Sequence, residues 1–405
     1  MEMKMNDFHI ADRLGGRNFG TFPSYKFAQI QRLKEDFFRS NPSLPLLDFG
    51  IGRPTEPPSE VAVAAMNAAT ATCENHHYAD CGCFIFMEAA VRYMERVFSV
   101  AMEPERELLP SMGTKNAFTY LALALFNPGD VLLSTAPGYP VFPTHARYLG
   151  VQVHAMPLLE RNQFLPDFAD IPPEALRRAK VLHLNYPNNP TGACAPAEFF
   201  SDAVAFARKN HLILVHDAAY AGLHNEQFPP RSVLRVPGAK EVAVELHSCS
   251  KAHNMTGWRL GWICGNEKVI AAYREIKMNS DSGQFLPLQM GAIAALDDDC
   301  FCQKRMSIYG ERFSAAVRVF REKGFLFSSH SHPFYAYGPA PKEVNGIPMD
   351  SAAAFCQWLL RQCGVLLTDW DDTGNYLRAS MTIPMEAAAM EAELRERLRG
   401  YDFSI

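Results

Sequence analysis

The sequence predicts an α/β protein with a mostly parallel sheet in a large domain, joined to a smaller α+β domain. Short apolar runs of strand length alternate with helical stretches from about residue 46 to residue 285, a pattern typical of parallel strands covered by helices on both faces. Beyond residue 285 a long helical stretch leads into shorter strands. We therefore expect a large domain over 46–285, and a small domain that combines an N-terminal arm over 1–45 with the C-terminal residues 286–405.

Composition restricts the function. The chain has 405 residues, of which 48% are hydrophobic and 20% charged, as in ordinary globular proteins. A net charge of −5 without a basic run argues against nucleic acid or a membrane surface as the main partner. The apolar runs are too short to span a bilayer, and the polar residues 1–10 do not resemble a secretory signal. Ten irregularly spaced cysteines favour reduced thiols in the cytoplasm.

The first elements follow from periodicity and from turn residues. A helix is expected over 25–39 and a strand over 46–51, which Gly52 and Pro54 would end. Helical patterns also cover 88–97 and 117–126. The second of these helices follows small and polar residues at 111–116, and small residues at a helix N-terminus leave backbone N–H groups free to bind an anion.

The later elements complete the α/β pattern. Strands of the large domain are expected over 131–134, 151–155, 181–185, 212–216 and 242–247, with a helix over 196–209. The small domain is expected to contain strands over 334–337, 365–368 and 376–383, and helices over 350–362 and 385–399. In open α/β sheets ligands bind at the carboxyl ends of the strands, so reactive side chains are sought directly after these runs.

Two strands of the large domain are followed by ionisable residues. Asp217 directly follows the strand over 212–216; burying a lone carboxylate is costly, although an Asp that caps the next helix is the commoner arrangement. Lys251 follows the strand over 242–247, beside Ser248 and Ser250. Lone lysines are usually solvated, but a sheltered amine near other cations loses its proton more easily and can act as a nucleophile.

These residues occur in a recognisable order. The run 188–192 (Asn-Asn-Pro-Thr-Gly), Asp217 with Tyr220, the Ser-x-Ser-Lys run that ends at Lys251, and Arg259 together resemble the fold type I, class I/II aminotransferases over nearly the whole chain. Within that family, the segments at 22–27, 50–52, 136–141, 279–285 and 370–372 most resemble those of the LL-diaminopimelate aminotransferases.

The resemblance implies a pyridoxal 5′-phosphate (PLP) cofactor. Lys251 would bind it covalently and then move protons, Asp217 would pair with the ring nitrogen, and Tyr139 would stack on the ring. Asn189 and Tyr220 would bind the ring oxygen. The phosphate contacts would come from Gly113, Thr114, Lys115, Ser248, Ser250 and Arg259, and from Tyr78 of the neighbouring subunit in a homodimer.

The resemblance also implies the substrates. Arg378 would bind the α-carboxylate of an amino acid, and further substrate contacts would come from Tyr25, Gly52, Lys115, Asn189 and Ser282. The expected reaction moves an amino group between an amino acid and a 2-oxo acid such as 2-oxoglutarate, with LL-diaminopimelate, an intermediate of lysine biosynthesis, as the expected amino acid.

Several alternatives stay open. After Tyr78 the sequence has Cys81, Cys83 and Phe84, where the family has polar residues, so an aminotransferase for a different amino acid in a specialised pathway remains possible. A PLP-dependent lyase would use the same lysine and ring contacts. A regulator built on this domain would need a DNA-binding domain, for which no room is expected before residue 25.

A cluster of soft ligands needs a separate interpretation. Cys73, His76, His77, Cys81 and Cys83 fall within eleven residues, and such side chains can bind zinc. The two-pair CxxC spacing of common zinc sites is absent. We therefore expect a loop rich in cysteine and histidine, and no metal.

Overall fold

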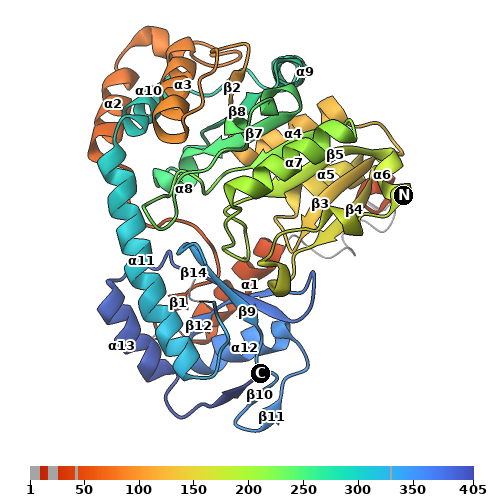
Figure 1. Ribbon diagram of the computed structural model, residues 1–405. Coiled ribbons are helices and arrows are strands. Elements are labelled where there is room, and N and C mark those ends of the chain that lie inside the picture. The colour runs from red at the N-terminus through yellow and green to blue at the C-terminus, as the bar shows by residue number, and fades with distance from the viewer. Residues whose placement is uncertain (1–9, 17–25, 42–43, 329–330) are drawn as a thin grey trace, which may run out of the picture.

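The structure is a computed structural model that describes residues 10–16, 26–41, 44–328 and 331–405. A large sheet with its helices forms one part, and a smaller part holds the C-terminal strands (Figure 1). The long helix α11 (Asp299–Glu322) runs beside both parts. The predicted α/β class with a mostly parallel sheet is confirmed.

The large sheet has seven strands in the order β2-β8-β7-β6-β5-β3-β4. All of them run parallel except β8, which is antiparallel to both of its neighbours. The strands are β2 (Leu108–Ser111), β3 (Val131–Ala136), β4 (Gln152–Pro157), β5 (Ala179–Asn185), β6 (Ile213–Asp217), β7 (Ala243–Ser248) and β8 (Gly261–Gly265).

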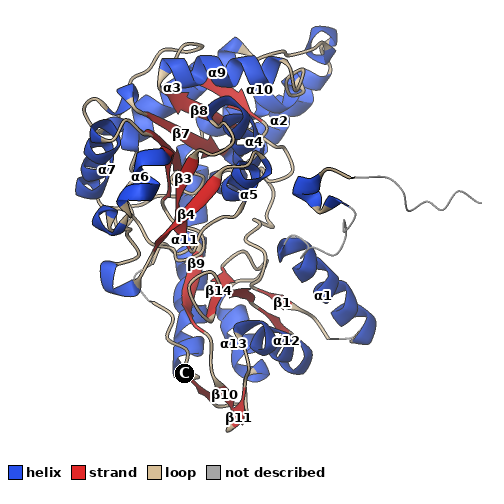
Figure 2. Cartoon of the chain, turned by 90° about the vertical axis from the view of Figure 1, so that its right-hand side faces the viewer, coloured by secondary structure: helices blue, strands red, loops and turns tan. Residues whose placement is uncertain are grey.

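Helices cover this sheet on both faces. Figure 2 shows the sheet nearly edge-on, with α6 and α7 on one side and α4 and α5 on the other. The central strands β5 to β8 are almost entirely buried, as expected of strands packed on both sides. The helices of this part are α2 (Glu60–Thr70), α3 (Phe84–Phe98), α4 (Thr114–Leu125), α5 (Val141–Tyr148), α6 (Pro173–Arg178), α7 (Ala197–Lys209), α8 (Cys249–Ala252), α9 (Glu267–Met278) and α10 (Leu286–Leu296).

The predicted strands of the large sheet lie within a few residues of β3 to β7. Strands β2 and β8 were not among the expected elements. Strand β2 has only four residues and contains Pro110, and β8 has a glycine at each end. Proline and glycine are depleted in strands, so these two strands form because the neighbouring strands offer hydrogen-bond partners.

The smaller part contains three short sheets. Strands β13 (Thr368–Trp370), β14 (Tyr376–Ser380) and β9 (Tyr335–Pro339) form an antiparallel sheet in that order. Helices α12 (Ala352–Cys363) and α13 (Ala387–Arg397) occupy the stretches predicted to be helical. The other strands are β1 (Leu47–Asp48), β12 (Val365–Leu366), β10 (Glu343–Val344), β11 (Ile347–Pro348) and β15 (Phe403–Ser404).

The strand expected over 46–51 was wrongly placed in the large sheet. Strand β1 covers only Leu47–Asp48, and it pairs in parallel with β12. The Asp48 carboxylate accepts the Gly50 backbone N–H at 2.9 Å, which turns the chain and ends the strand. Helix α1 (Lys26–Ser40) packs against α12. The N-terminal segment therefore joins the C-terminal strands, while the division into domains at 46 and 285 stays a prediction.

A buried ion pair ties α11 to the segment after β1. Arg312 is buried, and its Nη2 donates to Glu56 Oε1 at 2.6 Å while its Nε donates to the Met385 carbonyl at 2.9 Å.

In the part of the chain that the structure describes, no helix is long and apolar enough to cross a membrane. The cytoplasmic location expected from the cysteines stays a prediction.

Helix α4 contains a fully buried leucine and an exposed one, so substitution of each tests how this helix packs. Leu121 is fully buried, whereas Leu123 is 48% exposed. Leu121→Ala should lower the free energy of unfolding by about 2–5 kcal/mol, because it leaves a cavity, and Leu123→Ala should change it by only about 0.5 kcal/mol. Urea unfolding measures both, and equal losses would contradict this packing.

Candidate active site

A cavity of about 300 Å³ opens at the carboxyl edge of the large sheet. The ends of β6 and β7 and the loops after β3 and β5 contribute to it, together with β9 and β14 of the smaller part. It is lined by Ile51, Gly52, Arg53, Thr114, Lys115, Tyr139, Asn189, Asp217, Ala219, Tyr220, Ser248, Ser250, Lys251, Thr256, Arg259, Tyr335 and Arg378. Most of the residues predicted from the sequence are therefore brought together at one place.

Lys251 lies on the short helix α8, directly after β7, and its amine faces the cavity. Its Nζ donates to the Gly52 carbonyl. Burial, together with the positive charges of Arg378 and Arg259, lowers the pKa of Lys251 to about 7, although the negative charge of Asp217 opposes the shift. A large share of this amine is therefore neutral near pH 7, which a nucleophile or a base requires.

Asp217 ends β6, and its side chain is buried against the same cavity. The Ala219 N–H donates to its Oδ1 at 3.2 Å. A turn follows it and not a helix, so the helix-cap alternative is wrong. Burial raises the pKa of Asp217 to about 6, against the hydrogen bond from Ala219 and the charges of His216 and Lys251. Among the described residues no cation lies within ion-pair distance, so this carboxylate can still accept hydrogen bonds from a ligand.

An anion cradle is formed by the N-terminus of α4 and by Arg259. Gly113 precedes α4 with a φ of 75°, and a Cβ atom there would overlap the Arg259 guanidinium. Arg259 donates to the carbonyls of Thr256 at 2.8 Å and Met112 at 3.3 Å. Ser250 adds its hydroxyl, 3.5 Å from Arg259 Nη1. Free backbone N–H groups, a hydroxyl and a guanidinium are the donors that bind a phosphate.

Arg378 joins the smaller part to the large sheet. It lies on β14, is 1% exposed, and its Nη1 donates to Asn189 Oδ1 at 2.8 Å. Its guanidinium lies 4.5 Å from the centre of the Tyr335 ring and 5.2 Å from that of Trp370. Because Asn189 accepts through Oδ1, its amide nitrogen keeps two donors for a ligand.

Sequence analysis missed three polar residues of the cavity: Arg53, Thr256 and Tyr335. The hydroxyls of Tyr335 and Tyr220 lie 2.8 Å apart, and a Cβ atom at Gly52 would overlap the Tyr335 hydroxyl. Tyr335 begins a strand of the smaller part, so a search at the strand ends of the large sheet does not find it. Arg53 could have been suspected, because it directly follows Gly52.

The remaining predicted residues differ in their positions. Tyr139, Thr114 and Lys115 line the cavity, and Tyr25 lies outside the described residues. Tyr78 is 83% exposed, and Ser282 is also exposed. The Ala79 N–H donates to the Ser282 carbonyl at 3.1 Å, so both residues belong to one surface region outside the cavity of their own chain. The roles of Tyr78, Ser282 and Tyr25 stay predictions.

The cysteine and histidine cluster lies partly in this surface region. His76 Nε2 lies 2.9 Å from the Thr70 carbonyl, and its ring packs on Phe285. Cys73 is exposed, and Cys81 and Cys83 are half-buried. Within the described ranges, no group of three or more His, Cys, Asp or Glu side chains is arranged to hold a metal ion.

The charges around the cavity favour an anionic ligand. Five basic side chains line it, and Asp217 is the only acid among the described residues that do so. Such an excess of positive charge in a partly buried site attracts anions. A nucleophilic lysine, a buried carboxylate and an anion cradle at the carboxyl edge of an α/β sheet define an enzyme site that acts on small anionic molecules.

The family follows from comparison with known proteins. Residues 45–398 match the family described as aminotransferase class I and II, and the chain belongs to this family. It is therefore an aminotransferase.

Relatives and solved structures agree with this assignment. The chain is 42% identical over 371 residues to an LL-diaminopimelate aminotransferase of Methanocaldococcus jannaschii, covering 91% of this chain and 88% of that protein. It is 40% identical to the Methanococcus maripaludis enzyme of the same name, with 91% and 89% covered. Its fold is similar to substrate-bound BacF from Bacillus subtilis, with a TM-score of 0.87, 31% identity, and 95% and 97% of the two chains covered.

The environment of Lys251 generates a chemical prediction. An amine-selective acylating reagent attacks only the neutral amine, so in the ligand-free protein labelling of Lys251 should reach half of its maximum near its pKa of about 7. A free lysine derivative, the control, should do so near its ordinary pKa of about 10.4. Mass spectrometry of the Lys251 peptide across pH measures this, and a midpoint equal to that of the control would contradict the cationic, buried environment.

Proposed function

We propose that this protein is a PLP-dependent aminotransferase that moves an amino group from LL-diaminopimelate to a 2-oxo acid such as 2-oxoglutarate. The observation that carries the proposal is that Lys251 and Asp217 line one cavity beside an anion cradle. The family assignment supports the reaction type, and the names of the two relatives described above support the substrate.

The residues present fit PLP. Asp217 is a buried carboxylate with unused acceptor capacity, as a protonated ring nitrogen would need. The cradle of Gly113, Thr114 and Arg259, with Ser248 and Ser250 beside it, suits a phosphate. Lys115 and Tyr139 also line the cavity.

The chemistry divides between the cofactor and the chain. PLP, when bound, supplies an electron sink that stabilises negative charge on the amino acid's α-carbon. Asp217, when ionised, keeps positive charge at the ring nitrogen. Asn189 and Tyr220 offer donors to the ring oxygen, since Asn189 retains its amide N–H groups and Tyr220 has a hydroxyl.

Lys251 is the proton carrier in this proposal. Its amine is neutral in a large share of molecules near pH 7, so Nζ can accept a proton from the substrate and return it at another atom. Arg378 binds the substrate α-carboxylate through its planar guanidinium. Because Arg378 is held by Asn189 and Tyr335, the α-carbon is held in one orientation toward Lys251.

The far end of the substrate meets further positive charge. LL-diaminopimelate carries a second carboxylate at its other end, and Arg53 and Lys115 line the cavity in addition to the cofactor contacts.

One observation favours a second candidate, an aminotransferase for a different amino acid. Cys81 and Cys83 follow Tyr78, beside the exposed Phe84, where polar residues would suit a charged substrate better.

The proposed enzyme works as a homodimer. Tyr78 is 83% exposed, and the large apolar side chains of Phe84, Ile85 and Phe285 are exposed as well. An exposed apolar surface of this kind favours association. In a symmetric dimer it would be covered by the same surface of a second copy, and Tyr78 would reach the phosphate site of that copy.

The cofactor assignment is tested by a pair of variants. Purified wild-type protein with PLP should be yellow, and borohydride should fix the cofactor to the Lys251 peptide. Lys251→Ala should lose this covalent attachment. Its turnover number should fall by about 10²- to 10⁴-fold, because the proton carrier is gone. Arg378→Ala should keep the attachment and raise the KM for the amino donor by about 10²-fold. A colourless wild type saturated with PLP refutes the assignment.

The substrate is tested by two donors that differ in one group. L-Lysine lacks only the distal carboxylate of LL-diaminopimelate, so wild type with 2-oxoglutarate should form glutamate faster from LL-diaminopimelate. Arg53→Ala should lower the ratio of the two rates by about two- to fivefold, through loss of one partly solvated charge contact. If glutamate forms only with another amino acid as donor, the second candidate is favoured. If pyruvate or ammonia forms without glutamate, the enzyme is a lyase.

A further inference from the structure

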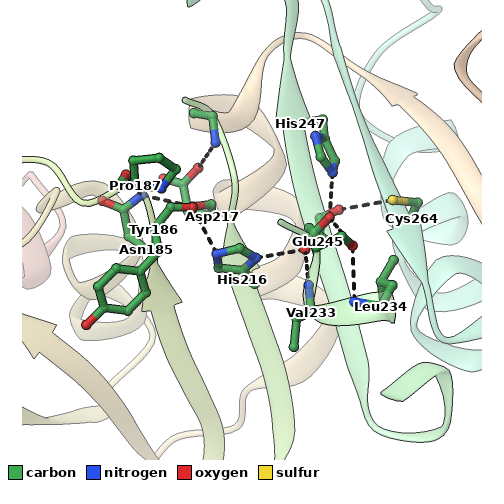
Figure 3. A network of polar contacts seen from close by, with 12 residues as sticks. Asn185, Tyr186, Pro187, His216, Asp217, Val233, Leu234, Glu245, His247 and Cys264 are labelled. Carbon is green, nitrogen blue, oxygen red and sulfur yellow. Dashed lines mark hydrogen bonds and ion pairs between the residues drawn. The ribbon is translucent and has the colours of Figure 1, made fainter. Parts of the chain in front are cut away.

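A buried polar network lies on the strands behind the cavity. Glu245 on β7 is fully buried, and its two carboxylate oxygens take part in four hydrogen bonds (Figure 3). The partners are His216 Nδ1 at 2.8 Å, His247 Nε2 at 2.6 Å, Ser232 Oγ at 2.8 Å and the Val233 N–H at 2.8 Å. These four donors use the full acceptor capacity of an ionised carboxylate. A proton on Glu245 would point at one of the donors, and that hydrogen bond would be lost.

Glu245 is therefore the negative member of the network. Burial acts to raise its pKa, but the charges of His247 and His216 and their hydrogen bonds hold the pKa of Glu245 well below its usual range. A buried anion of this kind requires a positive partner.

His216 is the positive partner that the geometry defines. Its Nδ1 faces the Glu245 carboxylate, and its Nε2 lies 3.1 Å from the Tyr186 carbonyl oxygen. An ionised carboxylate and a carbonyl can only accept hydrogen bonds. Both ring nitrogens of His216 must therefore carry hydrogen, which makes the ring an imidazolium.

The other groups around His216 are a neutral histidine, an aromatic ring and a second histidine that contacts the same carboxylate. His183 on β5 is buried, and burial followed by the charge of His216 lowers the pKa of His183 to about 3, so it is neutral. Phe200 of α7 covers the His216 ring, with the centroids 4.9 Å apart. His247 on β7 contacts the same carboxylate and stacks on Trp262. Asp217, the next residue on β6, is a further charged neighbour.

His216 is connected to the active-site edge through the backbone. The carbonyl that it binds belongs to Tyr186, whose N–H donates to the Asp217 carbonyl at 3.3 Å. Asn185 Nδ2 donates to the same Asp217 carbonyl at 2.9 Å, and Asn185 Oδ1 accepts the Asn189 N–H at 2.9 Å. The ring thus anchors the end of β6, which carries Asp217, to the loop that carries Asn189.

We infer that His216 is a charged positioning residue: held as an imidazolium by Glu245, it keeps Asp217 ionised and in place for the ring nitrogen of the cofactor. This inference rests on the proposed function, because Asp217 needs its charge only for such a ligand. His216 and Asp217 are adjacent on β6, and Glu245 lies across from His216 on β7. The positive charge of His216 acts to lower the pKa of Asp217, against the effect of burial.

The charge of His216 can be measured without any variant. In wild-type protein labelled with ¹⁵N-histidine, both His216 ring nitrogens should give the shifts of protonated nitrogen at about pH 7.5, whereas a neutral ring would show one nitrogen without hydrogen. Cofactor-free and PLP-bound protein should behave alike. A His216 ring nitrogen without hydrogen would overturn the inference, even if the protein binds PLP as proposed.

The effect on Asp217 needs a matched pair of variants. His216→Gln and His247→Gln each remove one ring from Glu245, but only His216 adjoins Asp217. The dissociation constant of PLP should rise as the pH falls and Asp217 takes up a proton. Without the nearby cation the pKa of Asp217 rises, so the weakening of PLP binding should begin about one pH unit higher in His216→Gln. In His247→Gln this weakening should begin at the same pH as in wild type.

The outcomes separate the inference from the proposed function. A purely structural role for the network would lower the unfolding midpoints of both variants and leave the pH dependence of PLP binding the same in all three proteins, which would overturn the inference. The cofactor's own titrations are common to the three proteins, so a difference between them reports on Asp217. Failure of wild type to bind PLP at any pH would count against the proposed function, and the histidine shifts would still decide the charge of His216.

Discussion

The Arg378 guanidinium crosses from β14 to the loop after β5, where Nη1 donates to Asn189 at 2.8 Å. A buried guanidinium must find acceptors, because an unpaired charge in the interior is very costly. Asn189 and the Gly50 carbonyl meet this need from two distant segments. The contact holds the smaller part against the carboxyl edge of the large sheet, and the cavity lies between the two.

Charge inside this cavity is divided unequally. Asp217 is the only acid among its described lining residues, against five basic side chains. Burial raises the pKa of Asp217 and lowers that of Lys251, so each environment favours the neutral form. The buried His216–Glu245 pair places a cation behind Asp217 and thereby counteracts the effect of burial. Opposed shifts of this kind let one site contain both a base and a carboxylate that stays ionised.

The groups expected to hold the cofactor and the loop expected to select the substrate differ in their support. Lys251, Asp217 and Asn189 lie at or just after strands of a buried sheet, where packing restricts their positions. Tyr78 and its neighbours lie on a largely exposed segment, which also contains Cys81 and Phe84. Surface segments tolerate substitution more readily than core strands, so substrate choice can change here while the chemistry is retained.

The sequence by itself was enough to predict most of the parallel strands, because apolar periodicity and turn residues are local signals. The roles expected for Asp217, Asn189 and Lys251 came from the resemblance of the runs around them to the class I/II aminotransferases. Tertiary structure alone decided that β1 pairs with β12, that Tyr335 and Arg53 enter the cavity, and that His216 meets Glu245. These contacts join segments far apart in the chain or depend on the register between strands. They are determined by how the elements pack, which no local pattern records.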